Sequence, residues 1–240
     1  MSGKKSEVQV ISKDRVEKHG EVLTAQKEVK AMIDLVGSVS QDPQSRFLEP
    51  ACGDGNFLIE VLNRKLGTLK ERYGKKKTQS VYEMHSLIAI SSLYGVDIQE
   101  DNVQKCRLRL AQEAEKVYKD IFKKSASDFY FEAICAILEK NIVCGNALSM
   151  KMVDQNANDT VQALVLTQWT PVGKLLLKRQ EFCYEHLVKV GNPKAKIPSE
   201  MVVSESGEKC FSPIPGKEYP PVSIYDLAKT MKKEKEENHD

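Results

Sequence analysis

Short, mainly apolar runs along the chain alternate with segments whose apolar residues have helical spacing. The runs at residues 47–48, 93–98, 141–148 and 161–166 are each bounded by polar or glycine residues, which predicts buried strands. From Asn56 onward, apolar residues recur at i, i+1, i+4, i+5 and i+9, which places them on one face of a helix. The pattern therefore predicts strands that alternate with helices.

Helices are predicted over residues 26–36, 81–92 and 99–110, with helical character continuing from 111 to 140. Thr24 is expected to cap the first of them, because a threonine hydroxyl can accept a hydrogen bond from a free backbone amide. This alternation predicts a single α/β fold with a mostly parallel sheet and helices on both faces. A ligand of such a fold is expected at the carboxyl ends of the strands.

The composition changes along the chain and suggests four segments. Residues 1–18 are polar and are expected to form a loose arm, whereas residues 19–190 hold the predicted strands and helices. Residues 191–231 are dotted with prolines and are expected to form an irregular extension. Residues 232–240 are a run of charges that we expect to be disordered.

Overall composition is that expected of a cytoplasmic protein. The 240 residues are 41% apolar and carry a net charge of +2. No stretch approaches the roughly 18 apolar residues of a membrane span, and the first ten residues lack the apolar core of a signal peptide. The six cysteines contain no C-x-x-C pair, which favours reduced core thiols over disulfides or a zinc site. We expect no metal ion and no membrane partner.

The most informative stretch is the turn between the strand at residues 47–48 and the helix that begins at Asn56. Gly53 and Gly55 allow a tight turn and a close approach of ligand to backbone. The third glycine of a dinucleotide fingerprint is absent, because Leu58 occupies its position. Glu49 and Asp54 flank the turn and would repel a diphosphate but attract an amino group and a sulfonium. The turn therefore favours S-adenosylmethionine over NAD or ATP, unless it only connects two elements.

Three later strand ends supply further candidates, each with a structural alternative. Asp97 is suited to accept hydrogen bonds from ribose hydroxyls, or else it caps the next helix. Asn146 is placed to meet an adenine edge, or else it forms an ordinary asparagine turn. Gln168 could accept a hydrogen bond, and Trp169 could stack on an extruded base or else pack in the core.

Read together, these motifs resemble the S-adenosylmethionine-dependent DNA adenine N6-methyltransferases of restriction–modification systems, which have a Rossmann-like class I methyltransferase fold. Residues 49–58 (EPACGDGNFL) are similar to their acid-P-A-C-G-x-G-x-F-L signature, and residues 20–24 (GEVLT) to their G-x-x-x-T-P motif, with Ala25 in place of proline. Residues 94–98 resemble the strand with the ribose acid, and residues 145–147 the adenine-side G-D-A. The resemblance implies cofactor contacts at Thr24, Glu49, Pro50, Ala51, Gly53, Gly55, Asn56, Phe57, Asp97, Ile98, Asn146 and Ala147.

The chain departs from this family where the target base is bound. The family carries N/D-P-P-Y/F at the end of its fourth strand, whereas residues 167–171 here read TQWTP. Gln168 and Trp169 are therefore the candidate catalytic residues, with DNA as the expected substrate. Two other hypotheses stay open. One is a cofactor-binding protein that does no chemistry, and the other is a methyltransferase with a non-DNA acceptor. The resemblance also suggests a specificity or restriction subunit as partner.

Overall fold

A computed structural model of the chain describes residues 24–73, 79–192, 194–204 and 207–237. The helices are α2 (Gln26–Asp34), the 3-10 helix η1 (Gly37–Gln41), α3 (Asn56–Tyr73), α4 (Gln79–Ser91), α5 (Glu100–Phe122), α6 (Asp128–Asn141), α7 (Tyr184–Lys189) and α8 (Leu227–Glu237). The strands are β1 (Phe47–Glu49), β2 (Leu93–Asp97), β3 (Ile142–Asn146), β4 (Lys151–Val153), β5 (Asp159–Ala163), β6 (Val165–Pro171), β7 (Leu176–Cys183), β8 (Ser199–Val203), β9 (Lys209–Pro213), β10 (Lys217–Glu218) and β11 (Val222–Ser223).

The largest sheet has the order β1-β2-β3-β4-β5. Its first three strands are parallel, with Phe47 opposite Leu93 and Gly95 opposite Ile142. β4 runs antiparallel to β3, and β5 antiparallel to β4. The α/β class is thus confirmed, whereas the predicted mostly parallel sheet is found only over β1, β2 and β3.

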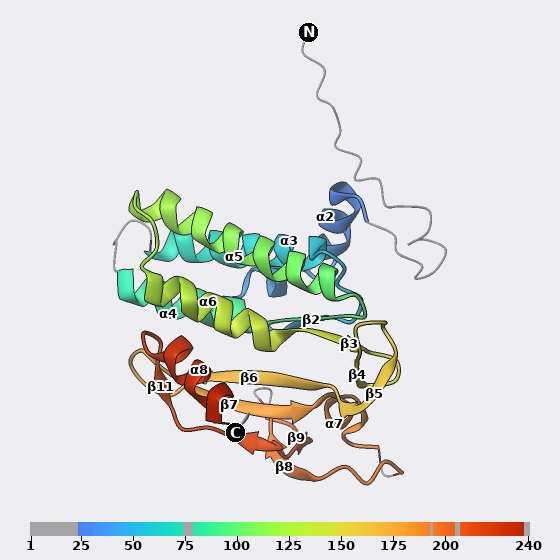
Figure 1. Cartoon of the computed structure of the whole chain (residues 1–240). Helices are drawn as coiled ribbons and strands as arrows, with labels where there is room; N and C mark the ends of the chain where they lie inside the picture. Colours follow the sequence, from blue (N-terminus) through green and yellow to red (C-terminus); the bar gives the residue numbers. More distant parts are fainter. Residues whose placement is uncertain (1–23, 74–78, 193, 205–206, 238–240) are drawn as a thin grey trace.

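Three layers of secondary structure position the strand ends (Figure 1). Helices α3 and α5 lie side by side in one layer, and α4 and α6 lie beneath them, leading into β2 and β3. The hairpin of β6 and β7 forms the layer on the other side of α4 and α6, and α8 packs on α6. Because β1, β2 and β3 are parallel, these strands end at the same edge of the sheet.

The two faces of the parallel strands are buried against different partners. Leu93 and Ile142 belong to the main core, which the helices supply. Val96 and Val143 point to the other face and form a second cluster with residues of β6 and the start of α7. Among the described residues, the long helices therefore cover one face only, so the prediction of helices on both faces is corrected. A hairpin can cover the second face because Leu164 and Leu166 supply apolar side chains there.

Several predicted elements differ from the observed ones at their ends. The helix expected from residue 99 to 140 is broken at Lys123, which adopts a left-handed conformation with φ of 57°. Ser127 then starts α6, because its hydroxyl accepts a hydrogen bond from the Tyr130 amide. The cap of α2 is Ala25 rather than Thr24, and it makes no side-chain capping bond.

The buried strand predicted at residues 161–166 is wrong. Residues 159–163 form β5, in which Val161 is 99% exposed, and β6 begins only at Val165. Leu164, between them, is fully buried and marks the point where the chain turns inward. The mainly apolar run at residues 161–166 does not reveal this turn in the sequence, because β5 and β6 both contain β-branched residues typical of strands.

The extension expected to be irregular contributes regular structure. β10 and β11 pair with β7, and α8 buries Leu227 and Met231 in the main core. Buried Glu83 accepts hydrogen bonds from the hydroxyls of Tyr118 and Tyr225, each at 3.0 Å, which ties this extension to α4 and α5.

Residues 232–237, expected to be disordered, are helical in α8 because the apolar side of that helix packs on α6. The predicted loose arm at 1–18 and the last residues, 238–240, lie outside the described residues.

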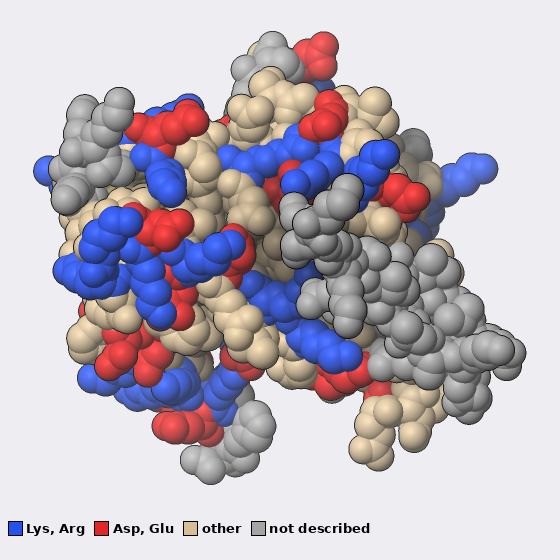
Figure 2. Space-filling view, turned by 90° about the horizontal axis from the view of Figure 1, so that it is seen from above, with Lys and Arg blue, Asp and Glu red and all other residues tan. Residues whose placement is uncertain are grey.

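The outer surface over α3 and α5 carries charges of both signs. Figure 2 shows Lys and Arg interspersed with Asp and Glu on this side of the molecule. Lys116 pairs with Glu113, and Lys119 with Glu115, each at 2.8 Å. Such pairs on a helix surface stabilise it modestly.

Three further properties bear on the site. Among the described residues, no helix is both long and apolar enough to span a membrane, and no group of His, Cys, Asp and Glu is arranged to hold a metal ion. The six cysteines, all within the described part, are unpaired. Cys52 and Cys106 are buried as expected of core thiols, whereas Cys135 and Cys210 are exposed, so that prediction holds only in part.

Candidate functional site at the β1–α3 turn

The turn after β1 is held by backbone hydrogen bonds and left-handed glycines. The Cys52 amide donates to the Val96 carbonyl at 2.9 Å, which extends the pairing of β1 with β2. Gly53 and Gly55 have φ of 51° and 95°, a region that disfavours residues with a Cβ. A Cβ on Gly55 would lie 2.6 Å from the Cys106 sulfur, whereas one on Gly53 would meet nothing within 4 Å. Gly55 therefore packs on α5, and Gly53 presents open backbone.

Asp97 connects the carboxyl end of β2 to this turn. Its Oδ2 accepts a hydrogen bond from the Gly53 amide at 2.9 Å, and its Oδ1 accepts one from the Gln99 amide at 2.8 Å. Asn102 of α5 donates to the same Oδ1 at 3.4 Å. Asp97 is half-buried, so its carboxylate both orders the turn and keeps an exposed side. The N-cap of α5 is Gln99 and the helix start has no side-chain capping bond, so Asp97 is not the helix cap that the sequence offered as an alternative. Asp97 lies beside the glycine turn.

Arg109 of α5 fixes the outer part of the turn, and sequence reasoning missed it. Its guanidinium donates to the Asp54 carbonyl at 2.7 Å and to the Asn56 side-chain oxygen at 2.9 Å. It also forms a 2.7 Å ion pair with the buried carboxylate of Asp54. Asp54 is therefore neutralised within the protein. The sequence offered no signal for this contact, because it joins residues that lie 55 positions apart.

Glu49 is the acid at the turn without an ion-pair partner among the described residues. It lies at the end of β1, and partial burial raises the pKa of its carboxyl group. Its Oε1 accepts a hydrogen bond from the Ala51 amide at 3.4 Å. Pro50 and Ala51 are exposed beside it. The turn thus presents two carboxylates, Glu49 and Asp97, on neighbouring strand ends.

The structure brings Thr24 and Asn56 together, although they lie 32 residues apart. The side-chain amide of Asn56 donates to the Thr24 carbonyl at 3.4 Å, and α3 begins at Asn56. Phe57 is half-buried against the main core. Residues 20–23 of the candidate methionine-end motif lie outside the described residues.

On the β3 side, Asn146 adopts the asparagine turn that the sequence left open. Its side-chain oxygen accepts hydrogen bonds from the Leu148 and Ser149 amides at 3.0 and 3.2 Å, and its amide donates to Asp159 at 3.0 Å. Ala147 packs against the second cluster. Contact with an adenine edge stays a prediction and would require the bond to Asp159 to be exchanged.

The predicted catalytic pair does not reach this turn. Trp169 is 7% exposed, belongs to the main core, and donates from its indole nitrogen to the Asn141 side-chain oxygen at 2.9 Å. Asn141 directly precedes β3 and also donates to the carbonyl of Leu93 at 3.2 Å, so Trp169 lies at the amino ends of the strands. Gln168 is adjacent and contacts Thr170. This position favours the core-packing alternative and does not support catalytic roles for Gln168 and Trp169.

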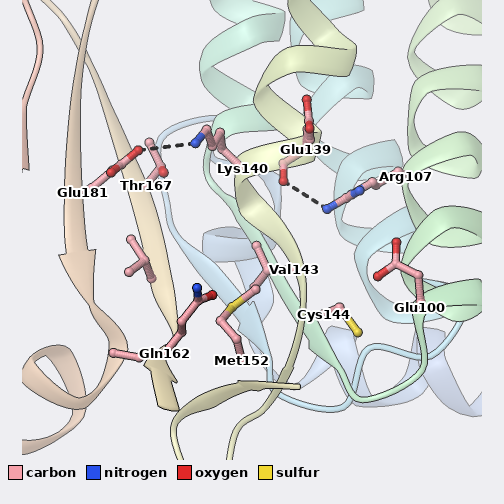
Figure 3. A pocket seen from close by; sticks show the side chains of 12 residues that line it. Glu100, Arg107, Glu139, Lys140, Val143, Cys144, Met152, Gln162, Thr167 and Glu181 are labelled. Carbon is pink, nitrogen blue, oxygen red and sulfur yellow. Dashed lines mark hydrogen bonds and ion pairs between the residues drawn. The ribbon is translucent and has the colours of Figure 1, made fainter. Parts of the chain in front are cut away.

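A pocket of about 390 Å³ lies beside β3 (Figure 3). The Cys144 thiol on its wall donates to the Ile98 carbonyl, and burial and nearby Glu100 raise the pKa of Cys144 to about 12. Arg107 donates to the Glu139 carbonyl at 3.0 Å, and Lys140 pairs with Glu181 at 3.5 Å.

These polar groups therefore bind one another, and we assign them a structural role. Cys52 at the turn is likewise no nucleophile, because hydrogen bonding to Cys106 and burial raise the pKa of its thiol.

A parallel strand pair, a glycine turn and an acid at the second strand end are typical of nucleotide-binding α/β domains. The chain belongs to the MmeI DNA-methyltransferase domain family, which it matches over residues 24–194. It is also similar to a putative type II restriction enzyme and methyltransferase of Methanocaldococcus jannaschii, with 32% identity over 114 residues. That match covers 46% of this chain and 9% of the archaeal protein. No solved structure matched the chain.

Proposed function

We propose that this chain binds S-adenosylmethionine at the β1–α3 turn and transfers a methyl group to the N6 amino group of adenine in DNA. The observation that carries the proposal is the contact between the Gly53 amide and Asp97, with open space above Gly53. Membership of a DNA-methyltransferase family supports the reaction class and the DNA acceptor. The choice of the adenine N6 amino group as acceptor is supported by the resemblance of residues 49–58 to adenine N6-methyltransferases.

The residues at the turn fit this cofactor. Glu49 and Asp97 present carboxylates, one at each strand end, and neither has a Lys or Arg partner among the described residues. Two such charges attract a ligand with an amino group and a sulfonium and repel a diphosphate. Asp97 would accept hydrogen bonds from ribose hydroxyls, and Gly53 would let the ligand approach the backbone. When bound, S-adenosylmethionine supplies an electrophilic methyl group.

The contribution of the chain to the reaction is binding and orientation. Hydrogen bonds from Gly53 and Gln99 hold the Asp97 carboxylate in place, and Arg109 fixes the turn that carries Gly53. Such preorganisation lowers the barrier by holding the reacting groups in line and away from water. Little acid–base chemistry is needed for this transfer.

A role in restriction–modification is part of the proposal. The archaeal relative is named as a putative restriction enzyme and methyltransferase, and this chain spans 9% of its length. We propose that methylation by this domain accompanies a restriction activity, with a specificity or restriction subunit as partner.

The test is calorimetric titration with S-adenosylmethionine, followed by transfer of a radiolabelled methyl group to unmethylated duplex DNA. The proposal expects binding and incorporation into adenine, both weakened in Asp97→Ala. Asp101→Asn is the matched control, because Asp101 is an exposed acid near the start of α5, the helix that follows Asp97. Absence of cofactor binding would overturn the proposal, and incorporation only into RNA, protein or a small molecule would overturn the DNA acceptor.

A second candidate function is cofactor binding without methyl transfer. The position of Trp169 in the core favours it, because the residue chosen to stack on a target base is engaged with Asn141 instead. Tight cofactor binding with no incorporation into any acceptor, in the presence of restriction subunits, would support this candidate over the first.

A further inference from the structure

A second pocket, of about 580 Å³, lies at the opposite ends of the strands from the glycine turn. It opens between the amino ends of β1 and β2 and the end of β6. Its walls carry hydroxyl, amide and guanidinium groups from Ser91, Ser92, Gln168, Thr170 and Arg46. No Asp or Glu is among the described residues that line it. The only charged side chain among the described lining residues is therefore the positive Arg46.

A buried cation lies directly behind this wall. Lys65 of α3 is fully buried, and its ammonium donates to the Ser45 carbonyl and the Ser92 hydroxyl, two groups of the pocket lining. No carboxylate among the described residues lies within 4.0 Å of it. The nearby carboxylate of Asp42 accepts hydrogen bonds from the Ser45 hydroxyl and the Gln44 amide. Buried charges in proteins are normally paired. Lys65 is an exception, because it has no direct counter-ion among the described residues.

Arg46 adds a second positive charge at the rim. Its guanidinium forms no ion pair with the described acids, although it lies close enough to the Tyr94 hydroxyl to affect it electrostatically. An Arg guanidinium binds planar and tetrahedral oxyanions through several N–H groups at once. Arg46 and the charge of Lys65 thus favour a negative ligand, whereas the hydroxyls of Ser91 and Ser92 donate to the Ile88 and Ala89 carbonyls.

We propose that this pocket binds a phosphate oxyanion. Two sources share this chemistry, the phosphodiester backbone of a nucleic acid and free phosphate or a small phosphorylated molecule. The volume exceeds that of one phosphate group and admits either source. The site does not depend on cofactor binding at the glycine turn, because it shares no residue with Glu49, Gly53 or Asp97.

The test measures binding of inorganic phosphate, and separately of a 20-base-pair duplex, by calorimetry at constant ionic strength. Arg46→Gln should weaken binding by at least about tenfold, because it removes a charged hydrogen-bond donor. Lys119→Gln is the control, since it removes the same net charge from a lysine paired with Glu115 on α5. Its affinity should stay within about twofold of the wild type.

The outcomes separate the two sources. An Arg46 effect on the duplex alone identifies a nucleic-acid phosphodiester, and an effect on inorganic phosphate alone identifies a free phosphate. Equal losses in Arg46→Gln and Lys119→Gln, or no binding of either probe, would overturn the proposal. Ser92→Ala serves as a second variant, because it removes the lining hydroxyl that holds the Lys65 ammonium behind the wall and keeps both charges. It should also weaken binding of the phosphate probe that Arg46 affects.

Discussion

The amide of Gly53 donates a hydrogen bond to Oδ2 of Asp97 over 2.9 Å, and this bond joins the ends of two parallel strands. The residues are 44 positions apart in sequence. The bond orients the one glycine of the turn that has open space above it. Because Oδ1 is held by the Gln99 amide, the carboxylate is fixed from two sides. Its geometry is therefore set before any ligand arrives.

Replacement of Asp97 should weaken binding of S-adenosylmethionine. Asp97→Ala removes a charged acceptor worth about 1.5–3 kcal/mol, or roughly tenfold to 150-fold in affinity. It also frees the Gly53 and Gln99 amides, so a lower melting temperature is expected. Calorimetric titration at a temperature where the variant is folded measures the affinity. Asp101→Asn should bind like the wild type, and an unchanged affinity in Asp97→Ala would remove Asp97 from the site.

The two glycines of the turn should respond differently to alanine. Gly55→Ala combines a φ of 95° with a Cβ 2.6 Å from the Cys106 sulfur, so it should lower the free energy of unfolding by several kcal/mol. Gly53→Ala introduces a Cβ into open space at a φ of 51° and should cost only about 1–2 kcal/mol. Urea unfolding measures both values.

Gly53→Ala also tests where the ligand lies. Gly53→Ala should fold and lose cofactor affinity by more than about tenfold, because its methyl group occupies the space proposed for the ligand. Gly37→Ala is the matched control, with a φ of 62° and nothing within 4 Å of its Cβ, but outside the turn. Equal affinity in the two alanine variants would place the ligand elsewhere.

The sequence predicted the strand, glycine turn and helix over residues 47–66 because each rests on local chemistry, and α3 continues to Tyr73. Glycines permit the left-handed turn, and apolar spacing defines α3. What it could not predict was which distant residues meet. Arg109 reaches Asp54 across 55 positions, and Asn141 pairs with Trp169 across 28. Both contacts follow from tertiary packing, which no spacing rule records.

The same limit explains the wrong prediction for residues 161–166. An apolar run there fits one buried strand, yet Val161 is exposed and Leu166 buried because the chain passes from β5 to β6. The predicted catalytic residues followed from counting this run as a strand of the parallel sheet. With β6 paired to β7 instead, Gln168 and Trp169 fall at the amino ends of β2 and β3.

Trp169 should therefore act through stability. Trp169→Ala creates a cavity in the main core and leaves the Asn141 side-chain oxygen without its indole donor, at a cost of about 3–5 kcal/mol. Trp169→Phe keeps most of the volume and should cost less. Cofactor affinity should be unchanged in both, as measured by calorimetry on the folded fraction. Loss of methyl transfer in Trp169→Phe with unchanged stability would contradict this and restore the tryptophan to the target-base site.

Lys65 should make stability depend on pH in the alkaline range. Burial lowers its pKa from 10.5 to about 8, the charge of Asp42 opposing this shift. Between these values the unfolded chain binds a proton at Lys65 that the folded chain does not. Raising the pH from 8 to 10 should therefore increase the contribution of this group to folding, by on the order of 2 kcal/mol. The gain is confined to this window, because the pKa of Tyr225, raised by burial to about 12, favours unfolding above pH 10.

Urea unfolding at pH 7, 8, 9 and 10 tests this, with Lys65→Met as the variant. Methionine keeps most of the length of the side chain and removes the charge, so the rise should disappear while Ser45 and Ser92 lose a donor. Lys119→Met, at an exposed position, should keep the rise. The same pH dependence in wild type and Lys65→Met would show that Lys65 is not its source. Added phosphate should move the rise to higher pH if an anion binds beside Ser92, because a neighbouring negative charge stabilises the protonated ammonium.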